Sequence, residues 1–142
     1  MEDRYLYKAK SKDNGEWVQG YYVKGLDMYD KEIHLIFEPA TSFYSYGETA
    51  GWHEIDPSTI CRCTGLKDKN NRLIWENDIV KDDKGNLYKA FWQDNYYQFS
   101  WICIKSDKLP IGAKWSLWNI KSFEIEVIGS IFDNPELLES EE

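Results

Sequence analysis

The sequence predicts a mainly β protein built from small antiparallel sheets, and three observations carry this prediction. Apolar and polar residues alternate in many short runs, with the two-residue period of a half-buried strand. Turn-forming Asn, Asp and Gly residues separate these runs at short intervals. No long helical pattern lies between the runs, which excludes a parallel βαβ architecture. With 142 residues, the chain has the length of one ordinary domain or two very small ones.

The first 57 residues predict an N-terminal β-hairpin and sheet. Asn14 and Gly15 separate two apolar runs, and both residues tolerate positive φ, so they favour a hairpin turn. Asp56-Pro57-Ser58 is a turn signal, and we expect the boundary between two parts, 1–57 and 58–142, at this point. The strands predicted for the first part are 4–11, 16–24, 33–37 and 52–55.

Residues 58–142 predict a series of short strands and tight turns, an order that suits a small SH3-like barrel. The predicted strands are 59–64, 72–75, 78–81, 87–92, 96–104 and 123–127, with 114–120 ambiguous between strand and turn. Near the end, Asn134 and Pro135 have the residue types of a helix N-cap and first helical position. We therefore expect one short C-terminal helix.

Two of these strands show clean alternation, which predicts the side chains that share one face of the strand. In 96–104, one face carries Tyr97, Phe99, Trp101 and Cys103. In 123–127, the inward positions are Phe123, Ile125 and Val127, while Glu124 and Glu126 point outward.

Residues 64–80, TGLKDKNNRLIWENDIV, resemble the central motif of the YopX-like family of phage and prophage proteins. The preceding IDPSTICRC, the ending VIGSIFDNPELLE and the opening RYLYKAKSKDNGEWVQGY are similar to other parts of that family. The resemblance implies an SH3-like C-terminal part and an association with temperate phages and their hosts. It implies no established activity and supplies no catalytic or ligand residues.

The chain departs from the family pattern at three positions of the motif. Asn71 and Asn77 stand where the family has Gly, and Trp75 stands where it has Tyr. Asn is the residue other than Gly that adopts a left-handed backbone most readily. We therefore predict positive φ at Asn71 and Asn77, and we interpret the motif as two tight turns around a short strand rather than a catalytic site.

Charge and the chain's N-terminal sequence bear on partners and location. The formal net charge is −8, but residues 58–92 carry seven basic and five acidic side chains between two acidic flanks. The first residues are charged and lack the apolar core of a signal peptide, and no apolar run reaches about 18 residues. The expected location is the cytoplasm of the bacterial host, away from the membrane.

The three cysteines raise the question of a metal site. Cys61 and Cys63 would point to one face of a strand, and Cys103 and His53 could complete a tetrahedral zinc site. Structural zinc usually uses Cys pairs separated by two to four residues, and this chain has no second pair. The pattern favours reduced, half-buried cysteines beside Phe99 and Trp101, with no bound metal.

The sequence predicts no enzyme and no cofactor. Nucleophilic catalysis needs a base, and the only two histidines, His34 and His53, lack a nucleophile-elbow or oxyanion-hole signature nearby. Neighbouring carboxylates fit turns or a solvated strand face better than acid–base chemistry. These carboxylate pairs are Glu76 with Asp78, Asp82 with Asp83, and Glu124 with Glu126.

The remaining feature is a surplus of aromatic side chains for a small barrel. They are Trp75, Tyr88, Trp92, Tyr96, Trp115 and Trp118. Exposed aromatics can grip a peptide or stack on bases, whereas buried ones would join the two parts or form a homo-oligomer contact. The possible binding surface comprises Arg72, Trp75, Lys81, Tyr88, Lys89 and Trp92.

Two functions fit these patterns. The first is a non-enzymatic phage or prophage accessory protein that binds an unknown host or phage protein, since an acidic surface favours rapid association with a basic one. The alternative is a nucleic-acid-binding module that uses the locally basic, aromatic-rich segment 62–92. The net charge of −8 disfavours this alternative because it repels phosphates.

Overall fold

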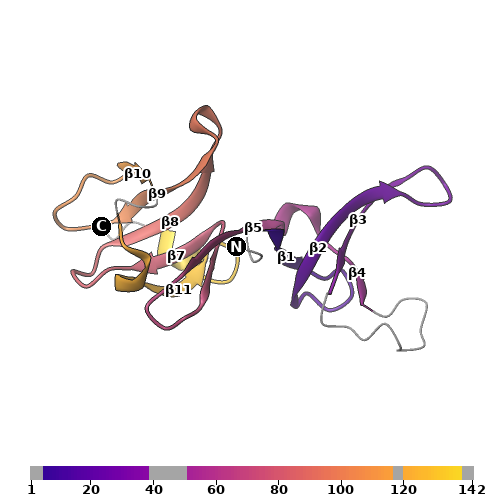
Figure 1. The fold of residues 1–142 in the computed structure, drawn as a ribbon, viewed down its shortest axis with the longest axis horizontal. Helices are drawn as coiled ribbons and strands as arrows, with labels where there is room; N and C mark the ends of the chain where they lie inside the picture. The colour runs from indigo at the N-terminus through magenta and orange to yellow at the C-terminus, as the bar shows by residue number, and fades with distance from the viewer. Residues whose placement is uncertain (1–4, 39–50, 117–119, 139–142) are drawn as a thin grey trace. The chain divides into compact units, whose positions relative to one another are not determined.

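The computed structural model describes residues 5–38, 51–116 and 120–138, and the chain forms two compact units (Figure 1). The first is Met1–Cys63 and the second is Thr64–Glu142, whereas the sequence predicted parts at 1–57 and 58–142. The prediction of a mainly β protein is confirmed. Every strand pairing given by register in the described residues is antiparallel, and the helices there are short 3₁₀ turns.

Four strands and the start of a fifth form the sheet of the first unit, in the order β4-β3-β2-β1-β5. Their bounds are β1 Tyr7–Lys10, β2 Trp17–Leu26, β3 Glu32–Phe37, β4 Trp52–Glu54 and β5 Cys61–Lys67. The predicted hairpin around Asn14-Gly15 is confirmed: the amide of Gly15 donates to the carbonyl of Ser11 (2.9 Å). Only Gly15 of that dipeptide uses positive φ, at 73°.

The β2–β3 hairpin extends beyond its neighbours on both sides (Figure 1). Pairing with β1 ends at Gly20, and β4 pairs only with Leu35–Phe37. The far part of the hairpin is therefore a two-stranded ribbon. Because two strands alone are marginally stable in water, this ribbon needs its own side-chain contacts.

The core of the first unit lies on one face of this sheet. Its fully buried members are Ala9, Ile36 and Ile55, surrounded by Tyr7, Val18, Tyr22 and Ile60. The register places Tyr22 opposite Ile36, so the core ends where the ribbon begins.

The second unit contains a five-stranded sheet in the order β10-β9-β8-β7-β11. The strands of this sheet are β7 Asp78–Lys81, β8 Leu87–Gln93, β9 Gln98–Lys105, β10 Lys114–Ser116 and β11 Glu126–Ser130. A further strand, β6 Leu73–Trp75, lies beside β5. Among the described strands, β10 and β11 are the edges of an open sheet. The predicted SH3-like barrel is therefore not confirmed.

The core of the second unit includes two residues predicted to share one strand face, Trp101 and Cys103. Its buried members are Ile74, Val80, Tyr88, Ala90, Trp101, Cys103 and Ile125. Ile125 is also on the predicted inward face, and Val127 packs against the same cluster.

Two aromatic residues lie outside the strands predicted for them and are exposed. Phe123 was predicted to point inward and Tyr97 to share a strand face with Phe99, and both predictions were wrong. Tyr97 ends the 3₁₀ turn η3 (Asp94–Tyr96) with a left-handed φ of 51°, so β9 starts only at Gln98 and Tyr97 is 84% exposed. Phe123 lies in the 3₁₀ turn η5 (Ser122–Glu124), where the amide of Ile125 bonds to the carbonyl of Ser122. β11 therefore begins after this turn, and Glu124 shares no strand face with Glu126.

The central motif builds turns, as predicted. Asn71 and Asn77 have φ of 65° and 72°. The buried Asp68 carboxylate accepts hydrogen bonds from the amides of Asn70 and Arg72 (both 2.9 Å), and the buried Asp78 accepts one from the amide of Trp75 (2.8 Å). These carboxylates hold backbone amides in place.

The C-terminal ending also has a structural explanation. The predicted short helix is a 3₁₀ turn, η6 (Pro135–Leu138). The Asn134 side-chain oxygen, expected to cap that helix, accepts from the amide of Ser130 (3.2 Å) instead. This oxygen lies 2.2 Å from the position that a Cβ on Gly129 would occupy, so only glycine leaves room for it.

Replacing Asn77 tests the left-handed turn. We expect Asn77→Ala to lower the free energy of unfolding by about 1 kcal/mol, because a side chain without a polar group disfavours this backbone. Asn77→Gly should be neutral or stabilising. Chemical denaturation measures both variants, and an equal effect of the two substitutions would contradict the turn assignment.

Candidate functional site

The tip of the β2–β3 hairpin is a turn held by one aspartate. The Asp27 carboxylate accepts hydrogen bonds from the amides of Tyr29 (2.8 Å) and Lys31 (3.0 Å). The amide of Asp27 donates to the carbonyl of Lys31 (2.8 Å), and Asp30 takes a left-handed φ of 60°. Such local side-chain bonds give the tip a defined backbone.

This turn presents apolar side chains to solvent. Met28 is 85% exposed and Tyr29 81% exposed, and Leu26 at the end of β2 is also exposed. Turns normally carry small or polar residues at such positions. A cluster of large apolar groups on a defined turn is a feature of interaction sites.

One face of the hairpin continues the apolar surface toward β4. Tyr21 and Val23 of β2 are exposed, and Tyr21 lies opposite Phe37 of β3 in the register. The Phe37 ring packs at 4.9 Å from the ring of Trp52, which is itself partly exposed. Apolar side chains thus follow this face from Val23 to the sheet edge, whereas Leu26 lies opposite Glu32 on the other face.

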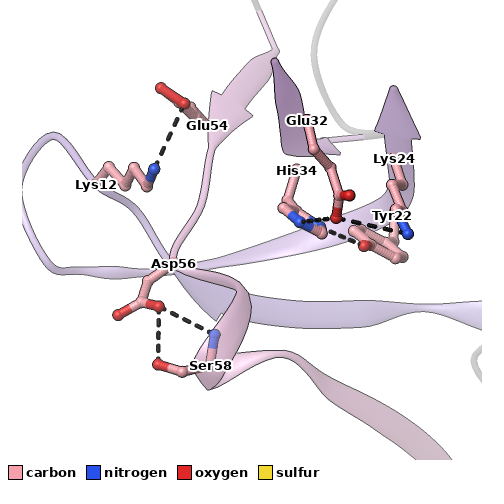
Figure 2. A network of polar contacts seen from close by, with 8 residues as sticks. All are labelled: Lys12, Tyr22, Lys24, Glu32, His34, Glu54, Asp56 and Ser58. Carbon is pink, nitrogen blue, oxygen red and sulfur yellow. Dashed lines mark hydrogen bonds and ion pairs between the residues drawn. The ribbon is translucent and has the colours of Figure 1, made fainter. Parts of the chain in front are cut away.

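The opposite face carries a polar network (Figure 2). The Tyr22 hydroxyl lies 2.5 Å from Nδ1 of His34, and Nε2 of His34 lies 3.0 Å from the Glu32 carboxylate. Lys24 contacts the same carboxylate at 3.5 Å. Because a carboxylate only accepts, Nε2 of a neutral His34 carries the proton and Nδ1 accepts from the Tyr22 hydroxyl.

A carboxylate, an imidazole and a hydroxyl in this order resemble a nucleophile with its base. The Tyr22 hydroxyl, however, has its pKa raised, chiefly by burial and then by the nearby Glu32 carboxylate, against the opposing effect of Lys24. A nucleophile needs a lowered pKa or a base that removes its proton. The network joins β2 to β3 on the polar face of the ribbon.

Figure 2 also shows the turn that follows β4. The Asp56 carboxylate accepts from the amide (3.0 Å) and the hydroxyl (2.8 Å) of Ser58, which caps the 3₁₀ turn η2 (Pro57–Thr59). The hydroxyl bond and the amide bond lower the pKa of Asp56. Lys12 and Glu54 form an exposed ion pair at 3.6 Å. The predicted turn signal at these residues is thus a helix cap.

The structure separates the residues of the predicted binding surface. Trp75 and Tyr88 are buried, and Trp92 is half-buried with its ring 5.1 Å from that of Phe99. The remaining members are Arg72 and Lys81, both exposed, and Lys89, which is half-buried. By the strand register, Lys81 and Lys89 lie on the face of the sheet opposite Tyr88 and Trp92. Trp118, another residue of the aromatic surplus, lies outside the described residues.

The cysteines and His53 are distributed over both units. Cys61 and Cys63 are buried in the first unit and Cys103 in the second, and all three are free thiols. Burial raises the pKa of Cys103. His53 contacts the Glu38 carboxylate at 3.0 Å. Within the described ranges, no group of three or more His, Cys, Asp or Glu residues is arranged to hold a metal ion.

A hollow of about 430 Å³ in the second unit lies beside Asp82 and Tyr88. The Asp82 carboxylate accepts bonds from the Tyr88 hydroxyl (2.9 Å), the Asn86 side chain (2.8 Å) and the amides of Lys84 and Asn86. Burial alone would raise the pKa of Asp82, but these bonds outweigh it, and the pKa is lowered. Its oxygens are engaged by the turn between β7 and β8.

The sequence did not predict the exposed hairpin tip, which lies between the predicted strands 16–24 and 33–37. The available signal was the placement of Leu26, Met28 and Tyr29 beside turn-forming Asp residues. Apolar side chains at the tip of a tight turn cannot reach the core of their own sheet.

A family model described as "YopX protein" matches residues 6–139. The chain belongs to the YopX family. Among curated proteins, none matches this sequence. The YopX match spans both units and includes the motif at 64–80 on which the resemblance was based.

This YopX protein has no helix, within the described residues, that is long and apolar enough to cross a membrane. Its polar side chains are largely engaged in turns. Within the described residues, large exposed side chains gather on two turns: the hairpin tip with Met28 and Tyr29, and η3 with Tyr96 and Tyr97.

The Asp82–Tyr88 bond predicts a change of stability at high pH. Burial and the Asp82 carboxylate raise the pKa of Tyr88, so the folded protein holds this proton more tightly than the unfolded chain does. The contribution of this hydrogen bond to the free energy of unfolding is complete below about pH 10 and is lost as the pH rises further. Tyr88→Phe should lose about 1–2 kcal/mol at neutral pH and show a shallower decline above pH 10. Parallel pH profiles of both proteins in urea unfolding would contradict this assignment.

Proposed function

We propose that this YopX protein is a non-enzymatic phage or prophage accessory protein that binds a host or phage protein through the β2–β3 hairpin. The observation that carries the proposal is the turn held by Asp27, which exposes Met28 and Tyr29. A defined turn loses little conformational freedom on binding, so apolar contacts made by its tip translate well into affinity.

The chemistry of the tip favours a protein partner. Tyrosine is enriched among the residues that dominate binding energy, and methionine adapts to irregular apolar pockets. Charges of both signs lie beside these side chains, since Lys31 stands between Asp30 and Glu32, and Lys24 contacts Glu32 at 3.5 Å. We therefore expect an apolar pocket on the partner, and the net charge of −8 favours a basic surface around it.

The engagement of polar groups supports a non-enzymatic role. The histidines contact Glu32 and Glu38, and the pKa of Tyr22 is raised. The carboxylates of Asp68 and Asp78 accept backbone amides. Three buried free thiols suit a reducing compartment, which supports the cytoplasm of the bacterial host as the place of action.

A photo-crosslinking residue at position 28 tests the proposal. In bacteria that carry the phage, it should trap one partner protein, whereas the same residue at Asp83, an exposed position of the second unit, should not. The purified pair should then bind at least 10-fold more weakly after Met28→Ala with Tyr29→Ala, the loss expected when contacts worth about 2 kcal/mol are removed.

The matched control is Ile111→Ala, which removes an exposed apolar side chain from a turn of the second unit. It should leave the affinity unchanged. Equal trapping from positions 28 and 83, or equal affinities for all variants, would refute the hairpin as the binding element. A crosslink from position 28 to a second copy of the chain would contradict a host or phage partner and would indicate a homo-oligomer instead.

A further inference from the structure

Four lysines lie on the face of the five-stranded sheet opposite Tyr88 and Trp101, where Ile79, Leu87 and Ser100 are buried among them and Lys89 is half-buried. Four strands contribute one each: Lys81 from β7, Lys89 from β8, Lys105 from β9 and Lys114 from β10. Lys81 and Lys105 both lie opposite Leu87, and Lys89 and Lys114 both lie opposite Ile102. Directly opposed residues share a face, so these residues form one surface, here called the lysine face.

The sheet geometry sets the spacing of these charges. Residues two strands apart are separated by roughly 10 Å, and residues two positions along a strand by roughly 7 Å. Cations at this spacing can contact several phosphates of one extended strand. Glu126, the cross-strand neighbour of Lys81, is paired with Lys69 at 3.2 Å, which reduces its effect on the lysine face.

A hollow of about 310 Å³ lies at one end of the lysine face, where Lys114 also lines it. Its other lining residues are Gln93, Tyr96, Gln98, Trp115 and Ser116. Tyr96 belongs to the η3 turn and is 67% exposed, so its ring is accessible for stacking. The same turn carries Asp94, an acidic residue near this end.

The amides in the hollow are held in a defined orientation. The Ser100 hydroxyl donates to the side-chain oxygen of Gln93 (2.9 Å), and the Gln98 amide nitrogen donates to Ser100 (3.3 Å). Ser100 is fully buried, and its hydrogen bonds hold both side chains in place. The amide nitrogen of Gln93 and the amide oxygen of Gln98 are then a donor and an acceptor suited to the edge of a base.

We propose that the lysine face and this hollow bind single-stranded nucleic acid, with a base stacked on Tyr96 and bonded to Gln93 and Gln98, and with phosphates on Lys89 and Lys114. A base inside a duplex is stacked and paired, so only a single strand can insert one here. An acidic peptide would use the lysines but has no base to place in the hollow.

This surface differs from the segment 62–92 considered for the alternative function. It retains Lys81 and Lys89 of that segment, but the hollow and two of its four lysines follow residue 92. The chain's acidic charge does not oppose phosphate binding on this surface strongly, because screening at ordinary salt limits the repulsion from acidic groups to a range of about 10 Å.

Fluorescence anisotropy of a labelled 15-residue oligothymidylate with the full chain tests the proposal. The logarithm of the association constant should fall with the logarithm of salt concentration, by about 0.7 for each phosphate contacted. Lys89→Glu with Lys114→Glu should weaken binding at least 10-fold and make this slope shallower. Tyr96→Ala should weaken binding about 5-fold or more while the slope stays the same.

Two controls match these variants. Lys31→Glu with Lys108→Glu makes the same charge change at exposed sites elsewhere and should alter affinity less than 2-fold. Tyr29→Ala removes an exposed tyrosine from the hairpin and should have no effect, which separates this proposal from the proposed function.

Three results would overturn the proposal. The first is the absence of salt-dependent binding to oligothymidylate by the wild-type chain. The second is equal loss in both lysine pairs, which would indicate only general charge repulsion. The third is equal affinity for polyglutamate or for a duplex together with no effect of Tyr96→Ala, which would indicate an acidic protein or a duplex as the ligand.

Discussion

The buried Asp68 carboxylate is the contact on which the second unit depends. One of its oxygens accepts amides from Asn70 and Arg72 within the turn of the central motif, and the other accepts the amide of Val127 (2.9 Å), 59 residues later. A single side chain therefore defines a local turn and ties the final strand to it. Because a buried carboxylate without donors is costly, the turn and β11 must form together.

The polar side chains of this protein mostly form hydrogen bonds that hold its backbone in turns and caps. This limits where a functional site can lie. Asp27, Asp56, Asp68, Asp78 and Asp82 all accept backbone amides at turns or caps. The features left for partners are on the surface and differ in chemistry: an apolar hairpin tip in the first unit, and a cationic face with an aromatic hollow in the second. We propose a protein as the ligand of the first feature and a nucleic-acid strand as the ligand of the second.

Local backbone chemistry explains which parts of the fold could be predicted from the sequence. Alternation located most strands, and Asn71 and Asn77 revealed their left-handed turns because that conformation depends on the residue itself. Tyr97 and Phe123 were misplaced because a 3₁₀ turn before a strand leaves the alternation intact. The exposed aromatic residues were harder to predict from the sequence. The burial of Trp75 and Tyr88 depends on which face of a sheet is covered, and this tertiary property is not encoded by either residue.

Equilibrium unfolding of Asp68→Asn tests the central claim most directly, because the amide keeps the shape of the side chain but exchanges one acceptor oxygen for a donor. If this carboxylate ties the motif turn to β11, the variant should lose about 2–3 kcal/mol, the range for hydrogen bonds to a charged group. The Val127 amide should also exchange its hydrogen faster than in the wild type. Unchanged stability together with unchanged exchange at Val127 would contradict the account.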